Sequence, residues 1–231
     1  MIKKPLPRFS FFMRIFHRPK KHLLVLALLL SNFVSAREFT LVLDPCVSTD
    51  AKISEETSAF AAELKHQLLI HIPSLRVALS RSHEERLQQQ DIASFANRLQ
   101  ADLFIHLNIS LEKDAARSVD FYSFAYDPVT DFWATKTPTL AFLPTHLIHL
   151  DHAKQSRKSM NNLASLIKAS STCSLNINSI LSLPYKPLKG LNCPAFALEL
   201  TVNNVRGWRT VLTELLPSFV TLITQELSYE S

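Results

Sequence analysis

The stretch Asp102-Leu-Phe-Ile-His-Leu-Asn-Ile109 decides the fold of this chain. It is apolar at nearly every position rather than at alternate ones, so both of its faces must be covered, as in a strand of a parallel sheet. An amphipathic helix precedes it, because Ile92, Phe95, Ala96 and Leu99 fall on one helical face. A helix that leads into a strand of this kind indicates an α/β unit.

Further strands and helices alternate along the sequence before and after that stretch. We expect strands at 38–43, 75–79, 119–126, 178–183 and 195–201, and helices at 54–72, 153–169 and 212–223. Ser54 is the expected N-cap of the first helix, and Pro73 its expected stop. The order predicts one α/β domain over residues 37–231, with a mostly parallel (mixed) twisted sheet of about six strands flanked by helices.

Residues 127–150 do not fit this alternation. The segment contains three prolines (Pro128, Pro138 and Pro144) and the aromatic residues Phe132, Trp133 and Phe142. A long irregular aromatic insertion inside a compact domain is often a lid or a binding loop. A packed connector explains the same composition equally well.

Composition excludes several classes of site. Only 2 glycines occur in 231 residues, where about 16 are usual, so no glycine-rich phosphate loop can form. The 3 cysteines contain no CxxC pair, which argues against a zinc knuckle and against a disulfide-dense fold. A Cys173–Cys193 disulfide is one option, and three partly buried thiols are the other.

The net charge of +5 comes from the N-terminus. Residues 1–36 hold seven basic residues and no acidic one, and the rest of the chain holds 18 basic and 20 acidic residues. A nearly neutral body lacks the cationic stripe that nucleic acids require, so we expect no nucleic-acid partner.

The N-terminal segment 1–36 predicts a secretory signal peptide. The basic region is followed by an apolar run, Leu23–Leu30, that is short for a membrane span, and Val34 and Ala36 suit a cleavage site before Arg37. The alternative is an uncleaved anchor, in which case the chain would touch the membrane only through this segment. Both alternatives place residues 37–231 outside the cytoplasm, in the periplasm or cell envelope.

Six landmarks occur in a particular order along the body of the chain. They are Asp44-Pro45, the helix-opening Glu56, Leu79-Ser80-Arg81, Ala96-Asn97, Ala101-Asp102-Leu-Phe-Ile105 and Pro194-Ala-Phe-Ala-Leu-Glu199. In order and spacing they resemble the zinc-dependent N-acetylmuramoyl-L-alanine amidases (amidase type 3), which cut the bond between N-acetylmuramic acid and the stem peptide of peptidoglycan. The resemblance covers residues 38–228 and implies an amidase-like fold for the whole domain.

The resemblance also implies roles for particular residues. In the family, two His and one Glu hold zinc, and a second Glu acts as the general base. The catalytic Glu corresponds to Glu199, and the Glu ligand to Glu56, with Glu55 one residue away. The two His ligands correspond to Val47 and Asn108, which are not competent, because an aliphatic side chain cannot bind zinc and an amide oxygen binds it poorly. Glu56 would then be a vestigial metal position, and we expect no cofactor.

The sequence therefore predicts a degenerate amidase-like envelope protein that is inactive as a zinc enzyme and binds peptidoglycan or a cell-envelope protein. The alternative is an active peptidoglycan hydrolase with a rearranged site. That site would use Glu199 with His106, or Cys46 with His106 and the nearby Asp44. A metal role for His146, His149 and His152 is a weaker option than a solvated helix start.

Overall fold

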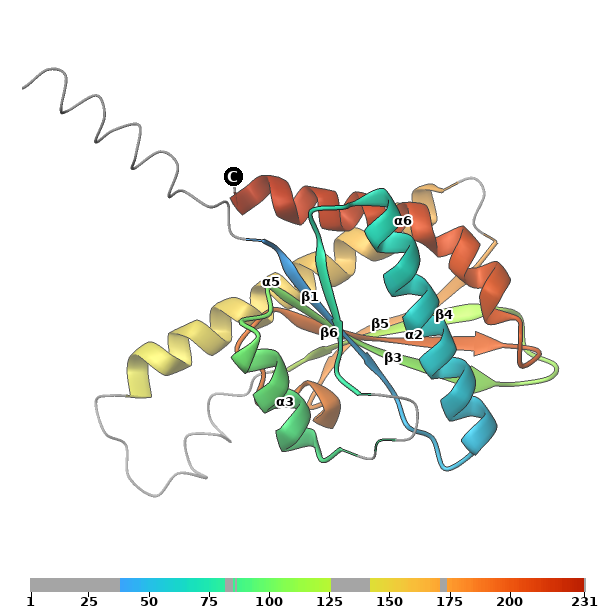
Figure 1. Ribbon diagram of the computed structural model, residues 1–231, viewed down its shortest axis with the longest axis horizontal. Coiled ribbons are helices and arrows are strands. Elements are labelled where there is room, and N and C mark those ends of the chain that lie inside the picture. The colour runs from blue at the N-terminus through green and yellow to red at the C-terminus, as the bar shows by residue number, and fades with distance from the viewer. Residues whose placement is uncertain (1–37, 82–84, 86, 126–141, 171–173, 231) are drawn as a thin grey trace, which may run out of the picture. The chain divides into compact units, whose positions relative to one another are not determined.

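Six strands form one sheet at the centre of the molecule (Figure 1). The computed structural model describes residues 38–81, 85, 87–125, 142–170 and 174–230. The strands are β1 (Thr40–Pro45), β2 (Arg76–Leu79), β3 (Leu103–Leu111), β4 (Ser118–Phe124), β5 (Asn176–Leu183) and β6 (Ala195–Val202). Their order is β2-β1-β3-β6-β4-β5, and every neighbouring pair is parallel except β4 and β6. The predicted mixed, mostly parallel sheet is confirmed.

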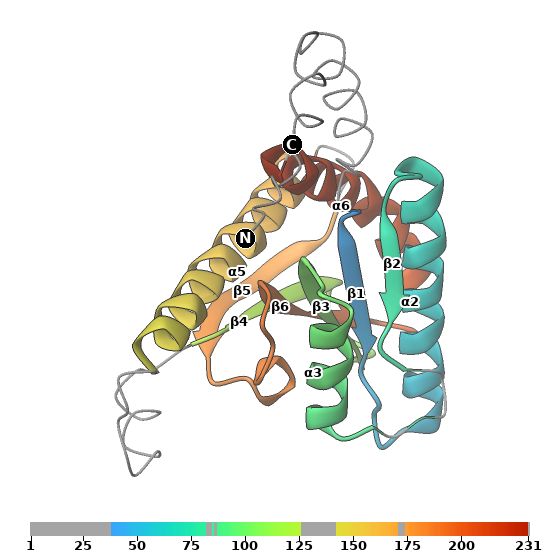
Figure 2. The same cartoon turned by 60° about the vertical axis from the view of Figure 1, so that its left-hand side comes forward.

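Helices cover both faces of this sheet (Figures 1 and 2). The helices are α2 (Ala51–His71), α3 (Gln89–Arg98), α5 (Phe142–Ala169) and α6 (Trp208–Glu230), together with the 3-10 turn η1 (Lys186–Leu188). The larger apolar cluster joins the sheet to α2, α5 and α6. A smaller cluster joins the opposite face to α3 and η1.

The alternation of side chains along β3 positions the candidate site. Leu103, Ile105 and Leu107 belong to the larger cluster, whereas Phe104 belongs to the cluster under α3. The side chains of His106 and Asn108 point to the same face as Phe104, because successive side chains of a strand point to opposite faces. The polar residues of β3 therefore lie on the α3 face, at the carboxyl end of the strand.

Helix α2 begins earlier than the sequence predicts. Its N-cap is Asp50, whose carboxylate accepts hydrogen bonds from the backbone N–H groups of Lys52 and Ile53. Ser54, the expected N-cap, lies within the helix, where its hydroxyl bonds to the backbone of Ser48. The prediction that Ser54 is the N-cap was wrong. An N-cap side chain must accept hydrogen bonds from the first free N–H groups of the helix, and Asp50 does so.

Helix α5 also begins earlier than expected, at Phe142. The last third of the segment 127–150 is therefore helical rather than irregular. Pro144 is compatible with this start, because proline is tolerated in the first turn of a helix. Residues 126–141, the expected signal peptide at 1–36 and Cys173 lie outside the described residues.

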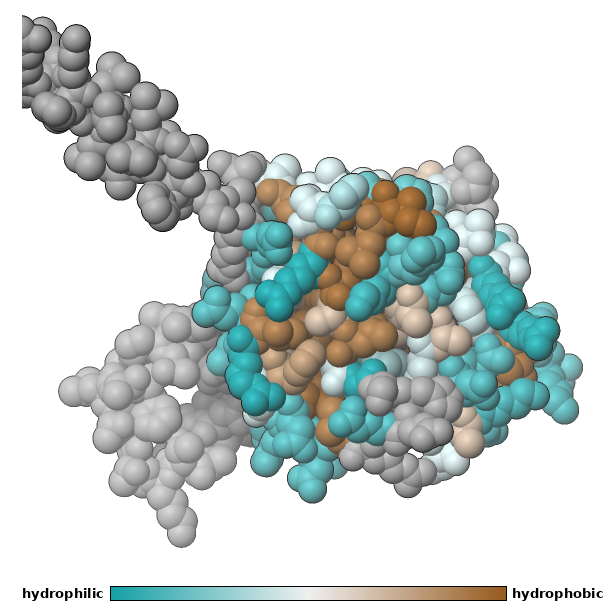
Figure 3. Space-filling model, in the orientation of Figure 1, coloured by the Kyte–Doolittle hydropathy of each residue, from teal (hydrophilic) through white to brown (hydrophobic). Residues whose placement is uncertain are grey.

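Among the residues whose burial is described, most large apolar side chains are buried, and the exposed ones are Ile70, Ile180 and Leu181. The face in Figure 3 shows apolar side chains gathered in a band over β2 and the adjoining parts of α2 and α3. Within the described ranges, no helix has the length and apolarity required to cross a lipid bilayer.

Candidate functional site

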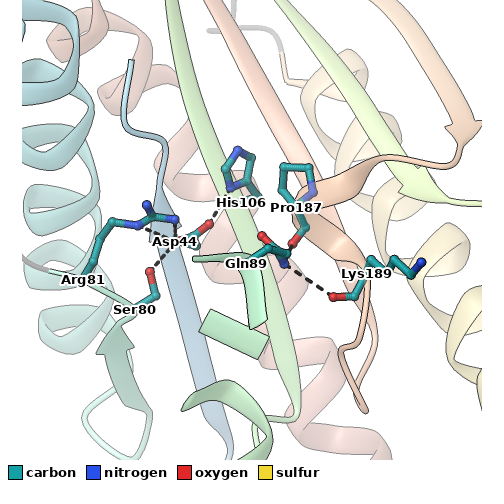
Figure 4. Close-up of polar contacts among 7 residues, drawn as sticks. All are labelled: Asp44, Ser80, Arg81, Gln89, His106, Pro187 and Lys189. Carbon is teal, nitrogen blue, oxygen red and sulfur yellow. Dashed lines mark hydrogen bonds and ion pairs between the residues drawn. The ribbon is translucent and has the colours of Figure 1, made fainter. Parts of the chain in front are cut away.

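Asp44 on β1 is the centre of a buried polar cluster. Its carboxylate accepts hydrogen bonds from the Ser80 hydroxyl, from Nε and Nη2 of Arg81 at 3.0 and 2.8 Å, and from Nδ1 of His106 at 2.6 Å (Figure 4). The Asp44 side chain is fully buried. Burial alone would raise the pKa of this carboxyl, but the bond to His106 and the charges of His106 and Arg81 outweigh burial and lower the pKa.

His106 on β3 is the register partner of Asp44 and is itself buried. Burial favours the neutral imidazole, yet the hydrogen bond with Asp44 and the interactions with Cys46 raise the pKa of His106 to about 9. The imidazole is therefore protonated at neutral pH. Its Nε2 atom is buried and has no hydrogen-bond partner in the part of the chain that the structure describes.

Cys46 comes directly after β1, two residues beyond Asp44. Its backbone N–H donates to the Leu107 carbonyl at 2.7 Å, so the parallel pairing of β1 and β3 continues to this residue. Cys46 is half-buried. Of the three residues that the sequence analysis named together, Asp44 and His106 are in contact, whereas no hydrogen bond between Cys46 and His106 is observed among the described residues.

Asn108 and Glu199 form a second polar pair beside the first. They are register partners on β3 and β6, and Nδ2 of Asn108 donates to Oε1 of Glu199 at 3.0 Å. On the other side of β6, Asp120 of β4 is the register partner of Glu199. The structure thus brings together two of the positions that the resemblance singles out, the catalytic Glu and the second His position.

Two tyrosines that the sequence analysis did not select complete the site. Tyr122 of β4 and Tyr185 are stacked, with their ring centroids 5.3 Å apart, and Tyr185 also meets the edge of His106 at 5.9 Å. Burial, followed by the negative charges of Glu199 and Cys46, raises the pKa of Tyr185 to about 12. No motif surrounds either tyrosine. The only signal is that Tyr122 is in register with Ala197, which requires knowledge of the strand order.

Glu56 has a different environment from Glu199. It lies on α2, and its Oε2 atom accepts a hydrogen bond from Nε1 of Trp208 at 2.6 Å. Trp208 belongs to the larger apolar cluster, on the opposite side of the sheet from the Asn108–Glu199 pair. Val47, the first His position by resemblance, is half-buried in the connection between β1 and α2.

The donor groups of the site do not suit zinc. In the described ranges, no group of three or more His, Cys, Asp or Glu residues is placed to hold a metal ion. Of the four positions implied by resemblance, Val47 has no donor atom, Asn108 uses its amide to bond Glu199, and Glu56 bonds Trp208. His146, His149 and His152 lie on α5.

Comparisons with known proteins agree with the fold. No protein-family model matches the sequence, and a search of curated proteins finds no match. Among solved structures, the catalytic domain of CwlV, an N-acetylmuramoyl-L-alanine amidase from Bacillus (Paenibacillus) polymyxa var. colistinus, matches with a TM-score of 0.53 and 17% identity. The match covers 82% of this chain and 98% of that domain.

A second solved structure, Cwp6 from Clostridium difficile, matches with a TM-score of 0.51 and 15% identity. That match covers 84% of this chain and 29% of Cwp6. At these identities the similarity concerns the fold. The chain has the α/β fold of the N-acetylmuramoyl-L-alanine amidase catalytic domains.

Proposed function

We propose that this protein is an exported, amidase-like protein of the cell envelope that binds peptidoglycan without zinc chemistry. The single observation that carries the proposal is the Asn108–Glu199 hydrogen bond. The amide of Asn108 donates a hydrogen bond to one oxygen of the carboxylate that would serve as the general base in a zinc amidase. With Val47 and Asn108 at the two His positions, neither His ligand is present, and the stacked rings of Tyr122 and Tyr185 lie near the Glu199 carboxylate.

The tyrosine pair supports binding. Tyr122 and Tyr185 present a stacked aromatic surface beside the carboxylate of Glu199, and both are only partly exposed. Aromatic rings with a polar tip are common at binding sites because they bury a large apolar area and retain a hydrogen-bonding group. A peptide or sugar of the cell wall offers both apolar faces and polar groups to such a surface.

Co-sedimentation of the purified chain with peptidoglycan tests this proposal, with zinc content and released stem peptide measured in the same preparation. We expect binding to the sediment, far less than one zinc per chain, and no peptide release. Tyr185→Ala should weaken binding about tenfold, because one stacked ring contributes roughly 1 kcal/mol or more. Glu55→Gln, an exposed change on α2, is the matched control and should bind normally.

Two results would contradict the proposal. About one zinc per chain with peptide release would show an active metal site instead. A chain that stays in the supernatant, while its Tyr185→Ala variant behaves identically, would point to a cell-envelope protein as the partner.

A further inference from the structure

Strand β5 is one edge of the central sheet. It pairs with β4 on one side and lies next to α5, at the end of the sheet opposite β2 (Figure 2). An exposed edge strand offers a row of backbone N–H and C=O groups with which another strand can pair. We propose that β5 pairs antiparallel with β5 of a second copy of this chain, about a two-fold axis at Leu181.

The composition of β5 is unusual for an edge that faces water. Edge strands are often protected from association by charged side chains or proline. The eight residues of β5, Asn176–Leu183, include neither. Two of the three exposed large apolar side chains in the described part of the chain, Ile180 and Leu181, are neighbours on this strand, with exposed fractions of 36% and 47%. A partner strand would cover both.

The hydrogen bonds to β4 show which backbone groups of β5 face the open edge. The carbonyl of Leu183 accepts from the backbone N–H of Ala125 at 3.0 Å, so Leu183 faces β4. Successive residues of a strand alternate in this direction, so Ile180 and Ser182 face outward. Among the described residues, no backbone group outside the β4 pairing bonds to either of them. These two residues therefore offer their N–H and C=O groups to a partner strand.

Two irregularities place the centre of the pairing. A register shift leaves Asn178 without a register partner on β4. At the other end, Pro184 follows the strand and has no N–H to donate. The regular segment between them is 179–183, and its middle residue is Leu181. An antiparallel copy centred there keeps the whole regular segment paired.

This register joins apolar side chains and opposes no charges. Ile180 and Ser182 form the hydrogen-bonded pairs, and Leu181 of each copy meets Leu181 of the other as a non-hydrogen-bonded pair, in which side chains are closer. Leu181 is the register partner of Tyr122, so this contact forms on the face that carries the tyrosine pair. Like charges directly opposite each other would weaken pairing, and β5 has none. An uncharged strand is therefore complementary to its own copy.

The size of this contact indicates a reversible dimer. Only the short segment 179–183 of each copy pairs, which buries less than the roughly 1,200–2,000 Å² of stable interfaces. Main-chain hydrogen bonds supply the affinity, as they do when a strand is added to an exposed sheet edge. We therefore expect monomer and dimer to exchange with concentration.

The dimer would present two candidate sites on one surface. Side chains directly opposite each other in an antiparallel pair point to the same face, so the tyrosine pairs of both copies face the same way. β6 is two strands from the edge, which places the two Glu199 residues five strand spacings, or roughly 24 Å, apart. This consequence rests on the proposed function: a polymer with repeated units would engage both copies and be bound more tightly.

Sedimentation velocity of the purified chain, without peptidoglycan, tests the dimer independently of the proposed binding function. We expect the sedimentation coefficient to rise with concentration across the micromolar range. Leu181→Lys should stay monomeric, because two like charges would face each other at the two-fold axis. Ile70→Lys is the matched control, since Ile70 is 57% exposed on α2, and it should dimerise like the wild type. Circular dichroism verifies that both variants are folded.

Disulfide trapping tests the register. Cα atoms of a non-hydrogen-bonded antiparallel pair lie about 4.5 Å apart, which a disulfide can span. Under mild oxidation, Leu181→Cys should form a bridge between positions 181 of two copies, identified by peptide mass spectrometry, and Ile70→Cys should form no such bridge.

Two results would overturn the proposal. One is a chain that stays monomeric up to about 1 mM, which would leave this edge to a strand of another envelope protein. The other is a dimer that Leu181→Lys does not weaken and that gives no 181–181 bridge, because its interface would lie elsewhere.

Discussion

Asn108 on β3 donates a hydrogen bond to Glu199 on β6, its direct register partner, at 3.0 Å. An amide NH₂ can only donate, so the pair is satisfied when Glu199 is ionised. The bond connects two central strands of the sheet on the face that carries Tyr122 and Tyr185. Glu199 therefore has a structural role here in addition to any role in binding.

Asn108→Asp tests this relationship. The substitution places a second carboxylate where the donor was, so one of the two pKa values must rise. We expect the free energy of unfolding to fall by about 1–3 kcal/mol at pH 8 and to recover near pH 5, where the two groups can share a proton. Urea unfolding at both pH values measures the effect. Asn161→Asp, an exposed change on α5, is the control and should show no such recovery.

Much of the fold could be predicted from the sequence, because the deciding signals are local. The apolar run in β3 and the helical spacing before it depend only on neighbouring residues, and both elements lie within three residues of their expected bounds. The landmarks Arg81 and Asn97 could be recognised although their partners could not. Arg81 bonds Asp44, and Asn97 bonds the backbone of Gly190 and Asn192, which holds α3 to the turn before β6.

The site was only partly predictable, because its contacts depend on strand order. Cys46, His106 and Asp44 could be placed on neighbouring strands from the β1 and β3 patterns. Tyr122 reaches the site only because β4 pairs with β6 in the antiparallel direction. The partner of Glu56 is Trp208, 152 residues further along the chain, and no periodicity in the sequence connects them.

Glu56→Leu should show that Glu56 supports the fold. Removal of the carboxylate leaves the buried indole N–H of Trp208 without its acceptor, which costs about 1–3 kcal/mol of the free energy of unfolding. Peptidoglycan binding by the folded variant should be unchanged. Glu55→Leu, at the preceding and exposed position, is the matched control. Equal stability of the two variants would mean that the Trp208 bond contributes nothing.

Asp44→Ala should be the most destabilising single substitution in the site. It leaves the guanidinium of Arg81 and the imidazolium of His106 buried without their counter-ion, and breaking a buried ion pair from one side costs about 3–5 kcal/mol. Asp50→Ala removes an exposed N-cap aspartate and should cost only about 0.5–2 kcal/mol. Chemical denaturation of both variants compares the two costs, and similar values would contradict the central role of Asp44.

The His106–Asp44 pair should also make stability depend on pH. The pKa of His106 is raised from 6.5 to about 9 in the folded chain, so its contribution is complete below pH 6.5 and is lost as the pH rises to about 9. A difference of this size corresponds to about 3 kcal/mol. The pKa of Asp44 is lowered from 3.8, so the contribution of Asp44 is lost only as the pH falls below that value.

Stability should therefore be greatest between about pH 4 and 6.5 and should decline toward pH 9. Urea unfolding across pH 5 to 9.5 gives the slope, and His106→Asn supplies the control, because an amide can still donate to Asp44 but does not titrate. The wild-type curve should fall over this range while the variant curve stays flat. If both curves decline in parallel, the loss arises from other groups and the imidazole is neutral in the folded chain.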